Sequence, residues 1–177
     1  IEERGSARQL VGVGRLAMMA AALTFSTFQI IVASYSPLSS TVTRSLHVAF
    51  LLLLTYLVYP ANRGGRQDTI PWYDCALALA AFALGFYHWF FEAALIQRAG
   101  QPAAVDLVIG TLVVILVFEG ARRVLGTALP IISGVFLAYG LFGEHLPGAL
   151  AHRPFGYDQV VAQLFLTTEG LYGIPTL

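Results

Sequence analysis

The chain has 177 residues, of which 57% are hydrophobic and only 11% are charged, and its formal net charge at pH 7 is zero. A soluble domain usually carries about 25% charged residues, so this composition excludes an ordinary water-exposed domain and favours a protein solvated by a lipid bilayer. The absence of net positive charge also removes the basis for nucleic-acid binding.

Five apolar segments are separated by short stretches that contain Pro, Gly, Ser or charged residues. Each segment approaches the ~20 residues that a helix needs to cross the hydrocarbon core, although the fifth segment is short. We therefore predict an all-α, polytopic membrane protein. The predicted spans are residues 16–33, 42–59, 73–91, 103–124 and 129–142.

All ten basic residues are arginines, and five crossings divide them unequally between the two sides of the membrane. The positive-inside rule assigns the richer side to the cytoplasm, so we expect a cytoplasmic N-terminus. The richer side carries Arg4, Arg8, Arg15, Arg63, Arg66, Arg122 and Arg123, and the opposite side carries Arg44, Arg98 and Arg153.

Aromatic residues mark the expected membrane interfaces. Trp72 and Trp89 bracket the third span, and a straight helix would separate them by roughly 26 Å, close to the hydrocarbon thickness. Tyr56 and Tyr59 end the second span, and Tyr35 ends the first. We predict that all five side chains are interface anchors, because Trp and Tyr are enriched at the level of the lipid headgroups.

Two groups of charged residues flank the fourth span. Glu119 precedes Arg122 and Arg123 by three and four residues, so one helix face carries all three. Asp106 lies in the first turn, where it can meet Arg98 across the intervening loop. We interpret both groups as structural pairs that anchor helix ends and set topology. The alternatives are a coupling element for an ion at Glu119 and a cation ligand at Asp106.

His88 and Glu92 are one helical turn apart in the third span. They predict an interfacial polar pair, or alternatively half of a metal site. The sequence offers no third ligand nearby, so we predict no metal. It also contains no Ser/His/Asp set and no glycine-rich phosphate loop at useful spacing, so we predict no enzymatic activity.

The last third of the chain has a different pattern. Apolar residues at 160, 161, 164 and 165 form one stripe, so residues 157–168 predict an amphipathic helix. This helix would lie at the membrane interface or against another part of the protein. A new apolar run then begins at the end of the sequence, so we expect a longer polypeptide.

The residues around the fourth span carry a resemblance to a known family. The run Arg98-Ala-Gly-Gln-Pro102, followed by Asp106 and by Glu119-Gly-Ala-Arg122-Arg123, resembles the fused membrane permease of tripartite ATP-independent periplasmic (TRAP) transporters, in the TAXI branch. Leu129-Pro-Ile-Ile132 and Glu169-Gly-Leu-Tyr-Gly-Ile-Pro175 continue it. The resemblance covers roughly residues 70–177, whereas the first two helices match only in hydropathy.

The resemblance implies a division of the chain. Residues 1–125 would be a small four-helix membrane scaffold, and residues 126–177 would begin the large transport domain. The residues that match the motif would then be scaffold or topology positions, and no substrate-binding residue can be carried over. These positions are Arg98, Asp106, Glu119, Arg122 and Arg123.

The resemblance also implies an activity and partners. Such a permease is a secondary active transporter that imports an organic acid, usually a carboxylate, delivered by a periplasmic binding protein. It lies in the cytoplasmic (inner) membrane of a bacterium or archaeon and uses no cofactor beyond a coupling ion, Na⁺ or H⁺, bound in the part of the transport domain outside this sequence. The partners would be the rest of that domain, or a separate large subunit that supplies it, together with the binding protein and the bilayer. The alternative is a stand-alone structural or assembly protein of the membrane without transport activity.

Overall fold

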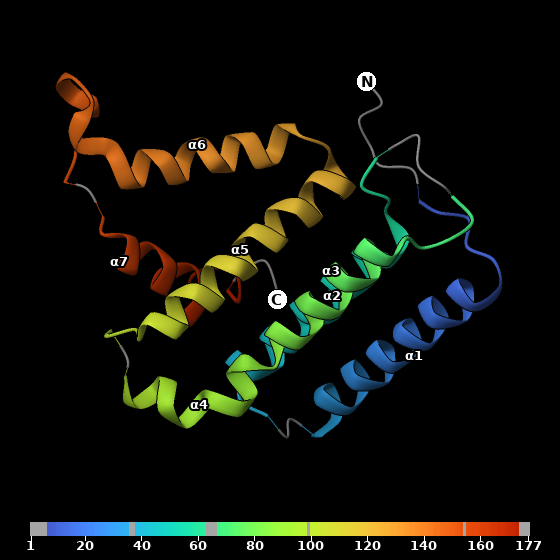
Figure 1. The fold of residues 1–177 in the computed structure, drawn as a ribbon. Coiled ribbons are helices and arrows are strands. Elements are labelled where there is room, and N and C mark those ends of the chain that lie inside the picture. The colour runs from blue at the N-terminus through green and yellow to red at the C-terminus, as the bar shows by residue number, and fades with distance from the viewer. Residues whose placement is uncertain (1–6, 36–37, 63–66, 99, 154, 174–177) are drawn as a thin grey trace.

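The computed structural model describes residues 7–35, 38–62, 67–98, 100–153 and 155–173 (Figure 1). The fold is 76% helical and has no strand among these residues, which confirms the predicted all-α class. Three of the arginines assigned to the cytoplasmic side, Arg4, Arg63 and Arg66, lie outside the described residues, as do the last two residues of the 169–175 motif.

The helices are α1 (Gly12–Tyr35), α2 (Ser40–Val58), α3 (Trp72–Gly85), α4 (Tyr87–Gln97), α5 (Ala104–Leu125), α6 (Ala128–Phe142) and α7 (Tyr157–Val161), with the short turns η1 (Gly143–His145), η2 (Gly148–Leu150) and the π-helical turn η3 (Ala162–Leu166). Among the described residues, five helical segments are long and apolar enough to cross a membrane, with α3 and α4 together forming the third. They coincide with the five predicted spans, so the protein is a multi-pass helical membrane protein.

The third span is not the single straight helix that the sequence predicts. It breaks at Phe86, whose backbone N–H is shared between the carbonyls of Ala83 and Leu84. Sharing of this kind tightens the last turn of a helix and lets the chain change direction. As a result α4 turns away from the axis of α3 (Figure 1), and Trp89 belongs to a different helix from Trp72.

Helix α2 is the centre of the bundle, because it contacts α1, α3, α4 and α5. It approaches α3 most closely where Gly85 faces Ala49: a Cβ atom added to Gly85 would lie only 2.2 Å from the Ala49 Cβ. Small residues at such crossings let helix backbones pack closely in a membrane. A buried apolar cluster that includes Leu52, Ala78 and Leu116 then joins α2, α3 and α5.

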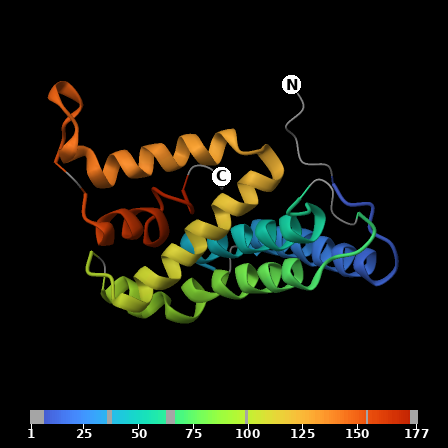
Figure 2. The same cartoon turned by 45° about the horizontal axis from the view of Figure 1, so that its top comes forward.

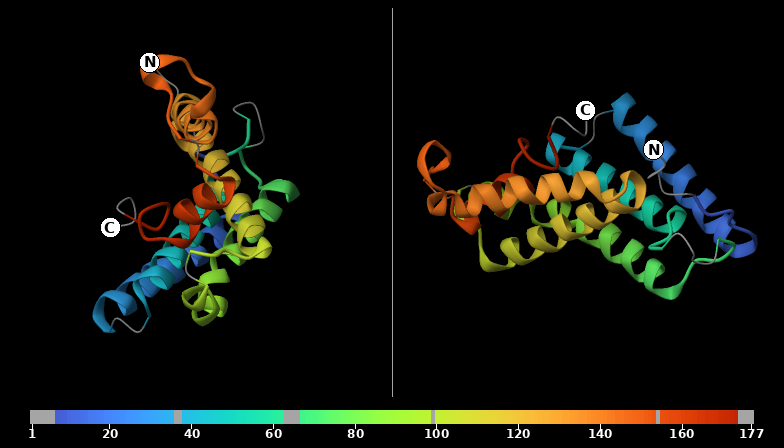
Figure 3. Two further views of the ribbon diagram at one scale, coloured as in Figure 1. Left: turned by 90° about the vertical axis from the view of Figure 1, so that its left-hand side faces the viewer. Right: turned by 90° about the horizontal axis from the view of Figure 1, so that it is seen from above.

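Helices α1 and α6 form the periphery of the molecule. Neither contains a buried residue, although both are strongly apolar. In Figure 2 α1 flanks one side of the bundle while α6 diverges from α5, and Figure 3 shows α6 nearly end-on at the edge of the fold. Exposed leucines and isoleucines cover both helices, and α6 also exposes phenylalanines. Such surfaces suit a hydrocarbon solvent.

The C-terminal segment packs back onto the bundle. The predicted amphipathic helix over 157–168 is shorter than expected, because α7 passes into the π-helical turn η3. Its apolar stripe faces the protein: Val161 and Phe165 are buried against Gly110 of α5, where an added Cβ would lie 2.7 Å from the Val161 side chain. The sequence left open whether this helix lies at the membrane interface or against another part of the protein. In the structure it packs against the protein.

Candidate functional site

A buried cluster of charges lies where the end of α2, the start of α3 and the end of α5 meet. Asp74, in the first turn of α3, binds Arg8 through one carboxylate oxygen and Arg123 through the other, the latter at 2.7 Å. The three side chains are only 0%, 1% and 2% exposed, respectively. Glu119 and Arg122 extend this group, and we call the five residues the Asp74 cluster.

The arginines of the Asp74 cluster also bind backbone carbonyls at the C-terminal end of α2 and in the loop that follows it. Arg8 donates to the carbonyl oxygens of Tyr56 and Leu57, both at 3.0 Å. Arg123 donates to the Tyr59 carbonyl at 3.1 Å, and Arg122 donates to the Ala61 carbonyl at 3.1 Å. The last carbonyls of a helix have no partner within it and carry negative partial charge, so cations stabilise them.

The predicted pairing of Glu119 is confirmed. Its carboxylate accepts from Arg122 Nε at 2.7 Å and Nη2 at 2.8 Å, and from Arg123 Nε at 2.8 Å. Arg123 thus bridges Glu119 on its own helix to Asp74 on α3. Sequence reasoning missed Asp74 and the role of Arg8. The available signal was an isolated carboxylate in the first turn of an apolar helix, where burial in a membrane demands a cationic partner.

The interpretation of Tyr56 as an interface anchor is wrong. The side chain is 0% exposed, and its hydroxyl donates to the Leu116 carbonyl on α5 at 2.6 Å. The Arg123 guanidinium lies over the Tyr56 ring, 4.7 Å from its centroid. Tyr56 faces α5 and the Asp74 cluster because its position on α2 lies on the buried face, which hydropathy alone does not reveal.

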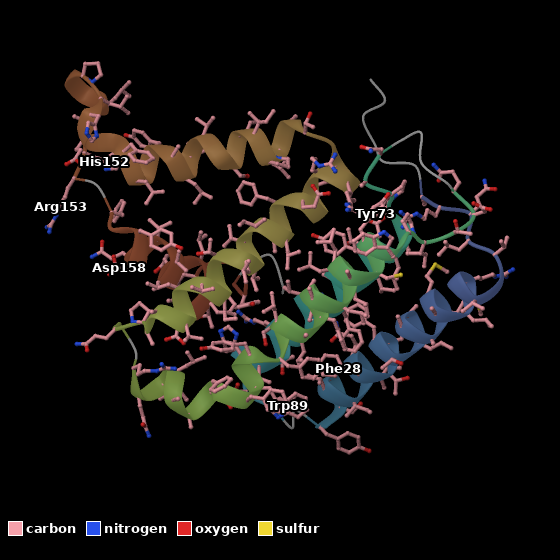
Figure 4. All side chains as sticks on the ribbon, viewed as in Figure 1. Phe28, Tyr73, Trp89, His152, Arg153 and Asp158 are labelled. Carbon is pink, nitrogen blue, oxygen red and sulfur yellow. The ribbon has the colours of Figure 1, made fainter. Side chains whose placement is uncertain are left out.

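Three of the other proposed anchors are exposed, and Tyr59 is only partly exposed. Trp72 is 81% exposed, Trp89 47% and Tyr35 80%. Tyr73, next to Trp72, and Trp89 lie towards opposite ends of the bundle in Figure 4. The separation calculated for a straight helix does not apply to Trp72 and Trp89, because the chain bends between them.

A second ion pair lies at the opposite end of α5. The Asp106 carboxylate is 0% exposed and accepts from Arg98 Nη2 at 3.3 Å, from the Ala103 N–H at 2.7 Å and from the Tyr87 hydroxyl. The predicted contact between Arg98 and Asp106 is therefore present, and Tyr87 is a partner that the sequence did not indicate. With three donors, Asp106 joins α4, the loop before α5 and the first turn of α5.

His88 is a polar residue that is buried within the third span. It is 3% exposed, its ring packs edge-on against Phe165 and Tyr172, and neither ring nitrogen has a hydrogen-bond partner among the described residues. His88 and Glu92 line one hollow beside the start of α2, with a volume of about 710 Å³. No group of three or more metal-ligating side chains is found in the described part of the chain.

The segment after η3 closes this region. The backbone carbonyl of Tyr172 accepts a hydrogen bond from Arg44 Nη1 of α2 at 3.0 Å. The Tyr172 side chain is only 1% exposed. Burial raises the pKa of the Tyr172 hydroxyl. The hydroxyl therefore stays neutral, which suits its position against the rings of His88 and Phe165.

Taken together, the described residues form a multi-pass helical bundle with an ion-pair cluster at each end of α5. Comparison with protein-family models, with curated proteins and with solved structures finds no match for this chain. The candidate function therefore rests on the residues themselves. The two ion-pair clusters join helix ends, and the charges within them are already paired.

Proposed function

We propose that this chain is the scaffold portion of the membrane permease of a TRAP-type secondary active transporter, which imports an organic acid delivered by a periplasmic binding protein. Residues 1–125 form the small scaffold part, and residues 126–177 begin the large transport domain. The observation that carries the proposal is where the residues of the family motif lie. These residues are Arg98, Asp106, Glu119, Arg122 and Arg123. All of them belong to the two ion-pair clusters at the ends of α5.

The geometry of the clusters supports a scaffold role over substrate binding. Asp74 and Asp106 are fully buried and already have two or three donors each. Breaking a buried ion pair by removing one partner typically costs about 3–5 kcal/mol, because the other charge is left unpaired. Groups with this function keep helices in fixed positions, whereas a substrate or ion site needs charges that can exchange partners.

The arrangement of arginines supports the proposed orientation in the membrane. Arg8, Arg122 and Arg123 gather in the Asp74 cluster, while Arg44 and Arg98 lie at the opposite ends of their helices. We therefore propose that the Asp74 cluster and the N-terminus face the cytoplasm, because seven of the ten arginines of the sequence then lie on that side. The membrane is the cytoplasmic membrane of a bacterium or archaeon, and the coupling ion, Na⁺ or H⁺, binds in the rest of the transport domain.

Transport in reconstituted vesicles tests the proposal. The natural polypeptide that contains this sequence is placed in proteoliposomes with a candidate periplasmic binding protein, and uptake of ¹⁴C-labelled carboxylates is followed under an imposed Na⁺ or pH gradient. We expect uptake that requires both the binding protein and one of the gradients. A folded, oriented protein that gives no uptake under either gradient would favour the stand-alone assembly protein instead.

A further inference from the structure

A hollow of about 710 Å³ lies where the start of α2, helix α4, the start of α5 and the turn η3 meet. This volume falls within the ~300–1,000 Å³ typical of sites for small molecules. We call it the His88 hollow, and its polar lining includes Ser39, His88, Glu92, Arg98, Asp106 and Gln163. Because α5 begins at this hollow and ends at the Asp74 cluster, the two lie towards opposite ends of the bundle.

The charges that line the His88 hollow do not balance. Arg98 is paired with Asp106 at 3.3 Å, and the Asp106 carboxylate accepts two further hydrogen bonds. The Glu92 carboxylate forms neither a hydrogen bond nor an ion pair with a described residue. The ionised lining residues are therefore two carboxylates and one guanidinium, which leaves one excess negative charge. A hollow of this kind concentrates cations.

His88 provides a second unpaired polar group, one helical turn before Glu92. Its side chain is buried, and neither ring nitrogen has a hydrogen-bond partner among the described residues. Side chains four residues apart on a helix have Cβ atoms about 5–6 Å apart, so one small group can meet both. A carboxylate and the unprotonated nitrogen of a neutral imidazole both accept hydrogen bonds, and an ammonium group supplies several donors together with a positive charge.

The rest of the His88 hollow favours an organic cation over an anion or a bare ion. The first turn of α2 could attract an anion, but Ser39 Oγ already accepts from the Val42 N–H at 3.3 Å and so satisfies one of its donors. Leu95, Ile96 and Leu166 supply apolar surface in the same lining. A ligand with a hydrocarbon part can cover these walls while its charged group meets Glu92.

We propose that the His88 hollow binds a small organic ammonium ion. The ammonium group lies between Glu92 and His88 and donates hydrogen bonds to the carboxylate and to the unprotonated ring nitrogen. The hydrocarbon part packs against Leu95 and Leu166. The ligand thus supplies the counter-charge that Glu92 lacks among the described residues. The proposal does not depend on the transport function.

Equilibrium dialysis of the full natural polypeptide against ¹⁴C-labelled n-butylammonium tests the site. The protein is held in lipid nanodiscs, and empty nanodiscs correct for partition of the probe into lipid. We expect saturable binding at about one site per chain. Unlabelled butyrate and butan-1-ol have a hydrocarbon chain of similar size without the positive charge, so neither should displace the label at equal concentration.

Two variants test the residues of the site. Glu92→Gln removes the charge, and His88→Phe keeps an aromatic ring in place but removes the acceptor nitrogen. Each should weaken binding at least about fivefold, as expected for the loss of a hydrogen bond to a charged group. The matched controls are Glu144→Gln and His145→Phe, which alter an exposed pair of the same residue types in η1 and should leave binding unchanged. Glu92 is only half-buried, so Glu92→Gln decides the test if His88→Phe fails to fold.

The proposal is wrong if the wild-type protein binds no butylammonium, because the rest of the polypeptide or ordered water would then complete the hollow. It is also wrong if butyrate or butan-1-ol displaces the label as well as unlabelled butylammonium does, since the site would then not recognise the ammonium group. Equal binding by Glu92→Gln and the wild type, or an equal loss in the two η1 controls, would mean that the ion binds elsewhere.

Discussion

Replacement of Asp74 by alanine is expected to remove about 3–5 kcal/mol from the free energy of unfolding, because Arg8 and Arg123 would remain buried without their counter-ion. Their side chains are only 1% and 2% exposed, so water cannot replace the carboxylate without a rearrangement of helix ends. The measurement is equilibrium unfolding in mixed micelles, followed by the loss of helical circular dichroism.

Two further variants separate the charge effect from a general loss of packing. Asp158→Ala removes an exposed carboxylate and should change the free energy of unfolding by less than about 0.5 kcal/mol. The triple variant Arg8→Met/Asp74→Leu/Arg123→Met removes the charges together and should recover part of the loss. Recovery stays incomplete because the arginines also bind carbonyls of α2. A loss below about 1 kcal/mol in Asp74→Ala would contradict the assigned role of the cluster.

The crossing of α2 and α3 gives the second large expected effect. Gly85→Ala places a methyl group 2.2 Å from the Ala49 Cβ and 3.3 Å from the Ser45 carbonyl oxygen, and the backbone of one helix must move to make room. Overpacking of this kind typically costs about 1–3 kcal/mol, or more where backbone is displaced. The thermal unfolding temperature in detergent should fall accordingly.

Gly140→Ala provides a matched control for Gly85→Ala. Gly140 also lies within a helix, but an added Cβ would have no atom within 4 Å. This variant should be neutral or more stable by up to about 1 kcal/mol, because alanine restricts the unfolded chain and favours helix. Equal unfolding temperatures for the two variants would mean that α2 and α3 do not pack as closely as the structure shows.

The class of fold was predictable from the sequence because long apolar runs leave few alternatives. A run of about 20 apolar residues in a membrane must be helical, since its backbone groups have no water to bind. The bend at Phe86 was not predictable in this way, because no proline marks it. The burial of Tyr56 was not predictable either, because it depends on which face of α2 meets α5. Hydropathy does not distinguish the two faces of a helix at the end of a span.

Local pairs were the predictable part of the candidate site. Glu119 with Arg122 and Arg123 follows from helical spacing alone, and Arg98 with Asp106 follows from a short loop. The contacts of Asp74 join residues that are 66 and 49 positions apart, so they depend on how the ends of three helices align. Similarly, the isolation of the His88 ring nitrogens arises from packing by residues 165 and 172, which no local pattern connects to the third span.

The proposed topology has five crossings, with the Asp74 cluster at the cytoplasmic face and the Arg98–Asp106 pair at the opposite face. Cys75 is the only cysteine of this sequence. Its replacement by alanine, together with that of any cysteine elsewhere in the natural polypeptide, provides a background for single cysteines at Asn62, Gln101 and His145. A membrane-impermeant maleimide should label positions 101 and 145 in intact cells and position 62 only after permeabilisation. Labelling of positions 62 and 101 from the same side would contradict this topology.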